Sequence, residues 1–321
     1  MAAREKAASE SVDLTRCAKA TWKRGRRMRR IDLHIHTTAS DGTDTPAQAV
    51  EKAKKLGLAA IAVTDHDSAA GVPEAMEAGA MLGLEVVPGV ELSTDWRGHR
   101  AHLLGYYIDP VSPALEPALN WAVTERVERN EKIVALFQKD GFDISIPELE
   151  KEFPGAVLGR PHMAEHLLRK GYVSSVKEAF DRYLADGMPY FLPKGRIGLE
   201  RAVDLIRRSG GVAVLAHPLQ YGHDKKTLEE FLEDGVRFGV SGLEAVYSQH
   251  SPEDEALVRG YAQRLGLCVT GGSDYHGTRK PGLEMGSGYG FMEADYSLLE
   301  GLRAARKNVL LEEQEKGGEI R

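Results

Sequence analysis

The sequence predicts an α/β fold built on a parallel sheet, and two observations carry this prediction. Short, continuously apolar runs recur along the chain, as expected for strands that are buried on both faces of a sheet. Segments with helical periodicity separate most of these runs, and such alternation is typical of parallel α/β folds. With 321 residues, 42% of them hydrophobic and 28% charged, the chain is long enough for one large domain with a sizeable core.

The sequence also predicts where the strands lie and where several helices start and end. Seven strand-like runs are expected, at residues 31–35, 59–63, 84–87, 101–107, 211–215, 243–247 and 267–270. Residues 45–48 (TPAQ) combine an N-cap residue, a first-turn proline and a capping-box partner, and residues 251–254 (SPED) have a similar combination of cap and proline, so each predicts a helix start. Glycines stand where helices are expected to end: Gly57, Gly83, Gly141, Gly171 and Gly266.

The alternation lapses over residues 112–196, where the pattern is helical. Helices are expected at 116–139, 161–170 and 175–185, with Pro147, Pro154, Pro189 and Pro193 as breaks. We interpret this stretch as a helical insertion that divides the α/β body into a first part, 30–111, and a second part, 197–310. Residues 311–321 are expected to form a charged tail.

Charge is unevenly spread along the chain. The net charge is −6, but residues 1–30 carry +7 and the other 291 residues carry −13. An acidic body argues against stable duplex-DNA binding through a broad basic face. We expect residues 1–29 to be a basic extension without regular structure, serving as a targeting arm, a nucleic-acid tail or neither.

Two features bear on location and partners. No apolar run approaches the roughly 18 residues that a membrane helix needs, so we expect no membrane association. The two cysteines, Cys17 and Cys268, exclude a disulfide scaffold and a four-cysteine zinc site. A reducing, cytoplasmic location fits these observations.

Residues that can bind metals gather at the ends of the strand-like runs. The candidates, in chain order, are His34, His36, Asp41, Asp65, His66, Asp67, Glu91, His102, His217, Asp274 and His276. In a closed parallel barrel the carboxyl ends of the strands converge on one face, where active sites lie. Residues far apart in the sequence can therefore share one pocket.

The types of residue indicate what that pocket holds. Imidazoles and carboxylates without thiolates suit Mn²⁺, Fe²⁺ or Zn²⁺. His34 and His36 are alternate residues of a strand, so both rings can face one ion. Even without Asp65 and Asp67, the nine remaining candidates are more than one ion takes, so the count implies two or three ions, bridged by a carboxylate such as Glu91.

Each of these motifs, taken alone, has a simpler interpretation that involves no metal. A single His-x-His pair is weak evidence for a metal. Residues 65–67 (DHD) could be a solvated turn, and Asp274 could be a helix cap. The joint arrangement favours a metal centre, because five separate strand ends each present His, Asp or Glu.

Five segments resemble, in order, the motifs of the PHP (polymerase and histidinol phosphatase) superfamily. They are residues 31–37 (IDLHIHT), 64–67 (TDHD), 89–91 (GVE), 216–218 (AHP) and 272–276 (GSDYH), and the resemblance extends over about residues 30–310. It implies a distorted (βα)₇ TIM-like barrel with a trinuclear metal centre in which Glu91 bridges two ions. The implied ligands are His34, His36, Asp41, His66, Glu91, His102, His217, Asp274 and His276.

Further segments narrow the resemblance to the stand-alone PHP phosphoesterases. Residues 102–106 (HLLGY), 159–162 (GRPH) and 247–251 (YSQHS), around a helical insertion, are similar to members that include nucleoside 3′,5′-bisphosphate phosphatases, which also trim the 5′ ends of short RNA. The resemblance implies that Arg160 and Lys194 hold a substrate phosphate. His250 could reach the rim of the site. Alternatively, Arg160 starts a helix and bonds a carboxylate, and Lys194 is a solvated loop lysine.

The expected activity is that of a hydrolase acting on phosphoric ester bonds. Metal ions lower the pKa of a bound water towards about 7, so that hydroxide attacks phosphorus in line. Arg160 or a third ion takes up the remaining phosphoryl charge. Asp65 or Asp67 is expected to orient His66, and His217 or a metal-bound water to protonate the leaving oxygen.

The expected substrate is a small nucleotide, either a nucleoside 3′,5′-bisphosphate or the 5′ end of an oligonucleotide, and the expected cofactors are two or three divalent ions, Mn²⁺ first, with Fe²⁺ and Zn²⁺ as alternatives. Three other functions stay open. These are a histidinol-phosphate phosphatase, an enzyme of C–N bond hydrolysis, and a non-catalytic metal- or RNA-binding module.

Overall fold

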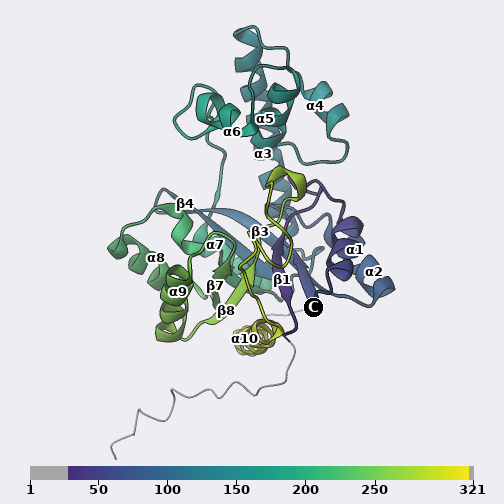
Figure 1. Ribbon diagram of the computed structural model, residues 1–321. Helices are drawn as coiled ribbons and strands as arrows, with labels where there is room; N and C mark the ends of the chain where they lie inside the picture. Colours follow the sequence, from purple (N-terminus) through teal and green to yellow (C-terminus); the bar gives the residue numbers. More distant parts are fainter. Residues whose placement is uncertain (1–27, 318–321) are drawn as a thin grey trace, which may run out of the picture.

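The computed structural model of the protein describes residues 28–317 (Figure 1). The predicted basic extension therefore lies outside the described residues, except for its last two positions. At that point Arg29 already packs on the body: its backbone N–H donates to Asp295 at 3.2 Å and its guanidinium lies 3.8 Å from the centre of the Tyr296 ring.

One sheet organises the body of the molecule. Its strands are β1 (Ile31–Ile35), β2 (Ala60–Val63), β3 (Glu85–Trp96), β4 (His99–Tyr106), β5 (Ile197–Gly198), β6 (Val212–Leu215), β7 (Gly242–Tyr247) and β8 (Cys268–Gly272). They follow the order β1-β2-β3-β4-β6-β7-β8, with β5 paired to β3. Strand β1 meets the segment after β8 where the backbone N–H of His36 donates to Tyr275 at 2.8 Å, so the sheet nearly closes. The predicted α/β barrel is confirmed.

Two details of the sheet differ from the prediction. Strand β4 pairs antiparallel with both β3 and β6, so the sheet is mixed rather than purely parallel. Strand β3 is much longer than the predicted run 84–87, because Pro88 and Gly89 lie inside it instead of ending it. A Cβ at Gly89 would come within 2.8 Å of the Val63 carbonyl oxygen, so glycine permits a close approach of backbones here.

Helices cover the outside of the sheet. They are α1 (Pro46–Lys55), α2 (Val72–Leu82), α7 (Leu199–Arg208), α8 (Lys225–Phe238), α9 (Pro252–Leu265) and α10 (Tyr296–Glu315), with the short 3₁₀ segments η3 (Pro218–Tyr221) and η4 (Gly277–Arg279). The predicted helix starts form at Thr45 and Ser251, and the structure has a capping box at both. Gly83 and Gly266 end α2 and α9 in the left-handed conformation. Helix α10 continues to Glu315, into the segment assigned to the tail.

The segment between β4 and β5 is helical, and much of it stands away from the sheet (Figure 1). It contains α3 (Glu116–Lys139), α4 (Ile146–Glu152), α5 (Arg160–Arg169), α6 (Val176–Ala179) and the π-helix η2 (Phe180–Leu184). These helices have their own hydrophobic core, in which Phe137 stacks on Tyr190 at 3.8 Å between ring centres. Helix α4 differs from the prediction, because Pro147 lies in its first turn, where proline is tolerated, and does not break a helix.

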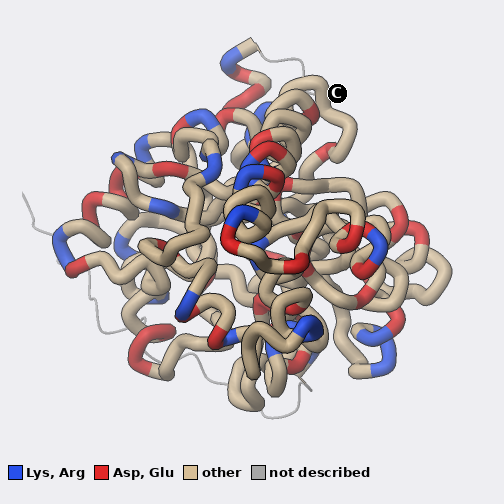
Figure 2. The backbone as a smooth tube through the Cα atoms, turned by 90° about the horizontal axis from the view of Figure 1, so that it is seen from above, with Lys and Arg blue, Asp and Glu red and all other residues tan. Residues whose placement is uncertain are grey.

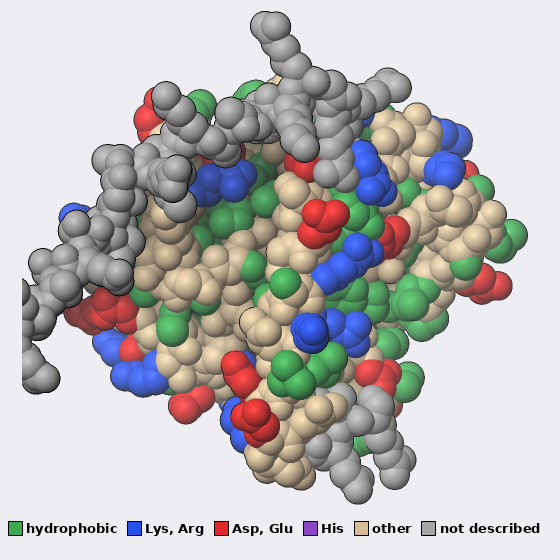
Figure 3. Space-filling view, turned by 90° about the horizontal axis from the view of Figure 1, so that it is seen from below, with side chains coloured by type: hydrophobic (Ala, Val, Ile, Leu, Met, Phe, Trp, Pro, Cys, Tyr) green, Lys and Arg blue, Asp and Glu red, His purple; other side chains and the backbone are tan. Residues whose placement is uncertain are grey.

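Charges of both signs are interspersed along the described chain. Lys and Arg alternate with Asp and Glu in the view from above (Figure 2), and the face seen from below also mixes basic, acidic and hydrophobic side chains (Figure 3). The part of the face that is visible in Figure 3 carries no broad basic patch. Within the same range, no helix combines the length and apolar character that a membrane crossing requires.

Candidate metal centre and anion pocket

Glu91 lies at the centre of a cluster of histidines. Its side chain comes from β3 and is fully buried. Five imidazole nitrogens lie within 3.5 Å of its carboxylate: His102 Nδ1 (2.9 Å) and His217 Nε2 (3.1 Å) at Oε1, and His66 Nδ1 (2.8 Å), His36 Nε2 (3.4 Å) and His34 Nε2 (3.5 Å) at Oε2. Burial alone would raise the pKa of Glu91, but the surrounding imidazoles hold it well below its ordinary value.

A second group of potential ligands overlaps with the first. His36, His66, Asp41 and His276 can bring one ligand atom each within 4.8 Å of one another. Asp274 adjoins this group, with Oδ1 3.3 Å from His36 Nε2. The structure therefore brings together all nine residues that the resemblance implies as ligands. His36 and His66 belong both to this second group and to groups that contain Glu91. The arrangement therefore has room for more than one ion.

Unpaired atoms test whether the cluster suits a cation. Both ring nitrogens of His36 and Nε2 of His34 are buried without a hydrogen-bond partner, and Nδ1 of His66 and Oε2 of Glu91 lie 2.8 Å apart without the geometry of a hydrogen bond. Buried polar atoms are almost always paired in native proteins. Nitrogen and oxygen donors that converge without pairing are what a divalent ion of the Mn²⁺, Fe²⁺ or Zn²⁺ type would satisfy, so the donor set fits such an ion.

The protonation of the histidines supports the same interpretation. Burial lowers the pKa of His36 well below its ordinary value and that of His102 to about 4, so both rings stay neutral. Burial also acts on His34, but Glu244 and then Glu91 overcome it and raise the pKa of that ring. Because a ligating imidazole must be neutral, binding of a cation to His34 would release a proton.

Glu244 is a member of the site that the sequence reasoning missed. It is fully buried in β7, with Oε1 2.9 Å from His34 Nδ1, while Oε2 accepts the backbone N–H of His217 at 2.9 Å. This contact turns Nε2 of His34 towards Glu91. The signal in the sequence was the one charged residue inside the apolar run 243–247.

The carboxylates on either side of His66 do not orient it, contrary to the expectation. The ring of His66 faces Glu91 instead. Asp65 accepts from the backbone N–H and hydroxyl of Thr37, at 2.8 and 2.7 Å, and from the hydroxyl of Ser40 at 2.5 Å. Asp65 therefore braces the loop that leads to Asp41.

Asp67 instead connects the barrel to the helical insertion. It accepts from the backbone N–H and hydroxyl of Ser93, at 2.7 and 3.0 Å, and from a guanidinium nitrogen of Arg126 at 2.8 Å. The ammonium of Lys194 also donates to it. Burial opposes ionisation, but the two cations hold the pKa of Asp67 far below its ordinary value.

The backbone is strained at several of these positions. Asp67, His217 and Asp274 have φ values of 54°, 26° and 58°, in a region that side-chain-bearing residues rarely adopt. All three follow strands of the barrel at the candidate site. Strain of this kind clusters at functional sites, where the surrounding structure imposes it.

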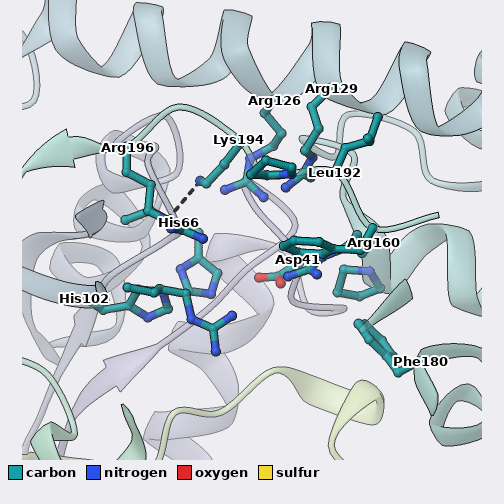
Figure 4. Close-up of a pocket in the computed structure, with 15 residues that line it drawn as sticks. Asp41, His66, His102, Arg126, Arg129, Arg160, Phe180, Leu192, Lys194 and Arg196 are labelled. Carbon is teal, nitrogen blue, oxygen red and sulfur yellow. Dashed lines mark hydrogen bonds between the residues drawn. The ribbon is translucent and has the colours of Figure 1, made fainter. Parts of the chain in front are cut away.

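A cavity of about 160 Å³ opens beside the metal-ligand cluster. Asp41, His66 and His102 form part of its wall (Figure 4). Six cationic side chains also line it: Arg100, Arg126, Arg129, Arg160, Lys194 and Arg196. Its remaining wall is largely apolar, with Phe180, Phe191, Leu192 and two prolines. The cavity thus suits a molecule that carries both negative charge and an apolar or aromatic part.

Arg126 and Arg129 also line the site, although the sequence analysis did not predict them. Both are buried on α3, and no carboxylate of the described residues lies within 4 Å of the Arg129 guanidinium. Burial, together with neighbouring arginines, lowers the pKa of Arg129 to about 9. A buried cation without a counter-ion calls for an anion. The signal was a polar interruption, at helical spacing, of the apolar face of Leu119, Ile133 and Phe137.

Arg160 and Lys194, the implied phosphate-binding residues, both line the cavity. Arg160 starts α5 and donates to the Leu184 carbonyl at 2.9 Å and to Asp186 at 3.2 Å. The alternative interpretation, in which Arg160 starts a helix and bonds a carboxylate, therefore also agrees with the structure. Lys194 is not a solvated loop residue, because only 10% of its side chain is exposed and its Nζ lies 2.9 Å from the hydroxyl of Ser93.

His250, the third residue assigned to phosphate binding, does not reach the cavity. It is buried after β7, with Nδ1 2.8 Å from the carbonyl oxygen of Ala245, and it is absent from the cavity wall. The hydrogen bond to its own strand turns the ring inward. His250 is therefore not part of the cavity wall, and its role at the rim of the site stays a prediction.

Comparisons with known proteins agree with this geometry. The PHP domain family matches residues 32–185. The 3′,5′-nucleoside bisphosphate phosphatase of Chromobacterium violaceum is 34% identical over 81% of this chain and 91% of its own, and the 5′-3′ exoribonuclease Rnm of Escherichia coli is 33% identical over 76% and 84%. A Bifidobacterium adolescentis protein, described as a metal-dependent phosphoesterase, superposes with a TM-score of 0.77 at 29% identity, over 86% of this chain and 96% of that one. The chain belongs to the PHP family.

Proposed function

We propose that this protein is a metal-dependent phosphoesterase that hydrolyses a phosphate ester of a small nucleotide, either a nucleoside 3′,5′-bisphosphate or the 5′ end of an oligonucleotide. One observation carries the proposal: a buried cluster of nitrogen and oxygen ligands around Glu91 opens into a cavity lined by six cations. The activities of the two bacterial relatives, a nucleoside bisphosphate phosphatase and an exoribonuclease, support the same substrate class.

The proposed cofactors are two or three divalent ions, Mn²⁺ first and Fe²⁺ or Zn²⁺ as alternatives. The proposed ligands are His34, His36, Asp41, His66, Glu91, His102, His217, Asp274 and His276. When bound, such ions neutralise charge on the phosphoryl oxygens and lower the pKa of water towards about 7. Nitrogen and oxygen ligands without thiolates support this choice of metals, and the low cysteine content supports a cytoplasmic location.

The cationic wall has a separate role in this proposal. Arg126 and Arg129 come from α3, Lys194 comes from the segment before β5, and all three bind a phosphate that is not cleaved. Asp67 holds Arg126 and Lys194 in place. The apolar wall formed by Phe180 and its neighbours accommodates the nucleoside and excludes water from one side of the cavity.

His217 is proposed as a ligand rather than as the proton donor to the leaving oxygen. It does not line the cavity, whereas His66 and His102 do. Its Nε2 lies 3.1 Å from Glu91 and its Nδ1 3.3 Å from the hydroxyl of Tyr221, so both ring nitrogens have neighbours within the cluster.

Two rival functions are less well supported. A histidinol phosphate carries one phosphate and would leave the buried Arg129 of α3 without an anionic partner. A non-catalytic binding module would not need an open cavity that places cations beside the candidate metal ligands.

A substrate panel tests the proposal. Protein loaded with Mn²⁺ is assayed for phosphate release from a nucleoside 3′,5′-bisphosphate, a 5′-phosphorylated oligoribonucleotide, histidinol phosphate and p-nitrophenyl phosphate. We expect the highest kcat/KM with one of the first two, and the metal-free protein should be inactive. No hydrolysis of any ester by the metal-loaded protein, or equal kcat/KM for all four, contradicts the proposal.

A further inference from the structure

Arg279 joins two parts of the molecule that are far apart in the sequence. It ends η4, three residues after His276, and its side chain is only 9% exposed. On one side, Nη1 donates to the carbonyl oxygen of Asp41 at 2.5 Å. On the other side, Nε and Nη2 donate to one carboxylate oxygen of Glu165, at 3.2 and 3.1 Å.

The first contact holds the loop that carries a candidate ligand. Asp41 lies outside any strand, in a turn after β1, and its Oδ1 is 3.4 Å from His276 Nε2. Unlike His34 and Glu91, which lie in strands, Asp41 lies in a turn that is held by backbone hydrogen bonds and by side chains of other segments. Asp65 braces the loop on one side through Ser40, and Arg279 braces it on the other through the carbonyl oxygen.

The second contact reaches the helical insertion. Glu165 belongs to α5, and the guanidinium of Arg279 also lies 5.2 Å from the centre of the Phe153 ring, just after α4. The segment after β8 rises from the barrel towards these helices (Figure 1). One buried side chain therefore links the insertion, which supplies much of the cationic wall, to the loop of Asp41.

We propose that Arg279 is a positioning residue that sets Asp41 in place for a divalent ion and ties that place to the helical insertion. The inference rests on the proposed metal centre. Its physical basis is that a guanidinium presents donors in a rigid planar fork, so it can satisfy the Asp41 carbonyl and the Glu165 carboxylate together. A lysine at this position offers a single ammonium and cannot reproduce both contacts at once.

Mn²⁺ binding tests the proposal without relying on turnover. Free Mn²⁺ is followed by electron paramagnetic resonance while it is titrated into the wild-type protein and into Arg279→Gln, Arg279→Lys and Asp41→Asn. We expect Arg279→Gln to weaken one class of Mn²⁺ sites by roughly 10- to 100-fold, the usual effect of losing a residue that orients a ligand. The same class should be weakened in Asp41→Asn, and Arg279→Lys should recover part of the affinity.

Arg207 offers a matched control. Its side chain is equally buried, at 8% exposure, and it likewise joins carboxylates, Glu312 and Glu313, to a backbone carbonyl, that of Gly239. It does not line the cavity. Arg207→Gln should therefore lower the melting temperature while leaving the Mn²⁺ isotherm unchanged.

The outcomes separate this inference from the proposed function. If Arg279→Gln behaves like Arg207→Gln, with lower stability and normal Mn²⁺ binding, Arg279 only holds the structure together and the inference is wrong. If Asp41→Asn binds Mn²⁺ normally, Asp41 is not a ligand and the inference fails with it. If the wild-type protein binds no Mn²⁺, the proposed metal centre itself fails.

Discussion

At the scale of single residues, Glu91 shows how local chemistry sets the centre of a site. Strand β3 continues through Pro88 and Gly89, so Glu91 projects from within a strand and not from a flexible loop. Backbone pairing fixes it: its N–H donates to the carbonyl of Asp65 at 3.1 Å, and its own carbonyl accepts from Asp67 at 2.8 Å. A carboxylate held this way can face histidines from several strands without moving.

The first prediction is that Glu91→Gln retains its fold but loses metal. Glutamine keeps the shape and removes the charge that offsets two cations, so activity should fall by more than about 100-fold, beyond the 10- to 100-fold typical of residues that only orient ligands. Elemental analysis of the purified variant measures the metal, and circular dichroism checks the fold. Full metal content with normal turnover would show that Glu91 is not a ligand.

The second prediction concerns pH. Burial lowers the pKa of Lys194 to about 8, although Asp67 opposes the shift. The ammonium is therefore charged below pH 8 and loses its charge as the pH rises through that value. We expect KM for a nucleoside 3′,5′-bisphosphate to rise above pH 8, and to rise less in Lys194→Arg, because a guanidinium stays charged. If KM depends on pH in the same way in both proteins, Lys194 does not bind the substrate phosphate.

At the scale of elements, α3 belongs to the insertion but shapes the site in the barrel. Its C-terminal part buries Ile133 and Phe137 in the core of the insertion, while Arg126 and Arg129, one to two turns earlier on the same face, reach the cavity. Packing of the apolar part therefore fixes the direction of the cations. A helix gives this precision because side chains three and four residues apart share a face.

The third prediction compares arginines of the insertion. Arg129→Ala removes a cation with no carboxylate partner in the described structure, so it should cost about 1.5–3 kcal/mol of substrate binding, or roughly 10- to 150-fold in kcat/KM for a bisphosphate. Arg160→Ala should cost less, because Asp186 already engages that guanidinium. Both should change p-nitrophenyl phosphate hydrolysis far less, since this ester has no second phosphate.

Arg182 serves as the control for that comparison. It lies in η2 of the same insertion, but its side chain is 52% exposed and pairs with Glu178. Arg182→Ala should leave kcat/KM for both substrates unchanged. An equal loss on bisphosphate and monoester in Arg129→Ala would instead indicate an effect on the metal centre.

At the scale of the whole molecule, the metal centre gathers strands from both parts of the barrel. Its candidate ligands begin at His34 and end at His276, with the insertion between them. Divalent ions bound to ligands from these strand ends would stabilise the folded state, because the unfolded chain does not hold the ligands together.

The fourth prediction follows from this linkage. Free Mn²⁺ at 100 times its dissociation constant should raise the free energy of unfolding by about 2.7 kcal/mol per site, and a chelator should reverse the gain. Urea unfolding with and without Mn²⁺ measures the effect. The gain should shrink at low pH, where protons compete for the imidazoles, and in Glu91→Gln. An unchanged unfolding midpoint in Mn²⁺ would contradict the metal centre.

Local patterns in the sequence predicted much of the fold and the composition of the candidate site. Apolar runs located the strands of the barrel, and caps such as Thr45 and Ser251 located helix starts, because both signals are local. The clustering of His, Asp and Glu followed from one general rule, the convergence of strand ends. The resemblance to the PHP family supplied the order and number of the ligands.

Contacts between residues that are far apart in the sequence could not be predicted, because they depend on how the chain folds in three dimensions. Glu244 beside His34, Arg129 beside the cavity and Glu165 beside Arg279 are separated in the sequence from the groups they serve, and no local pattern specifies such pairs. The same holds for His250, whose motif suggested the substrate site while a bond to its own strand turned it inward. The hydrophobic periodicity of a helix or strand predicts which of its faces is buried. Which neighbour covers that face depends on how the sheet closes and where the insertion packs.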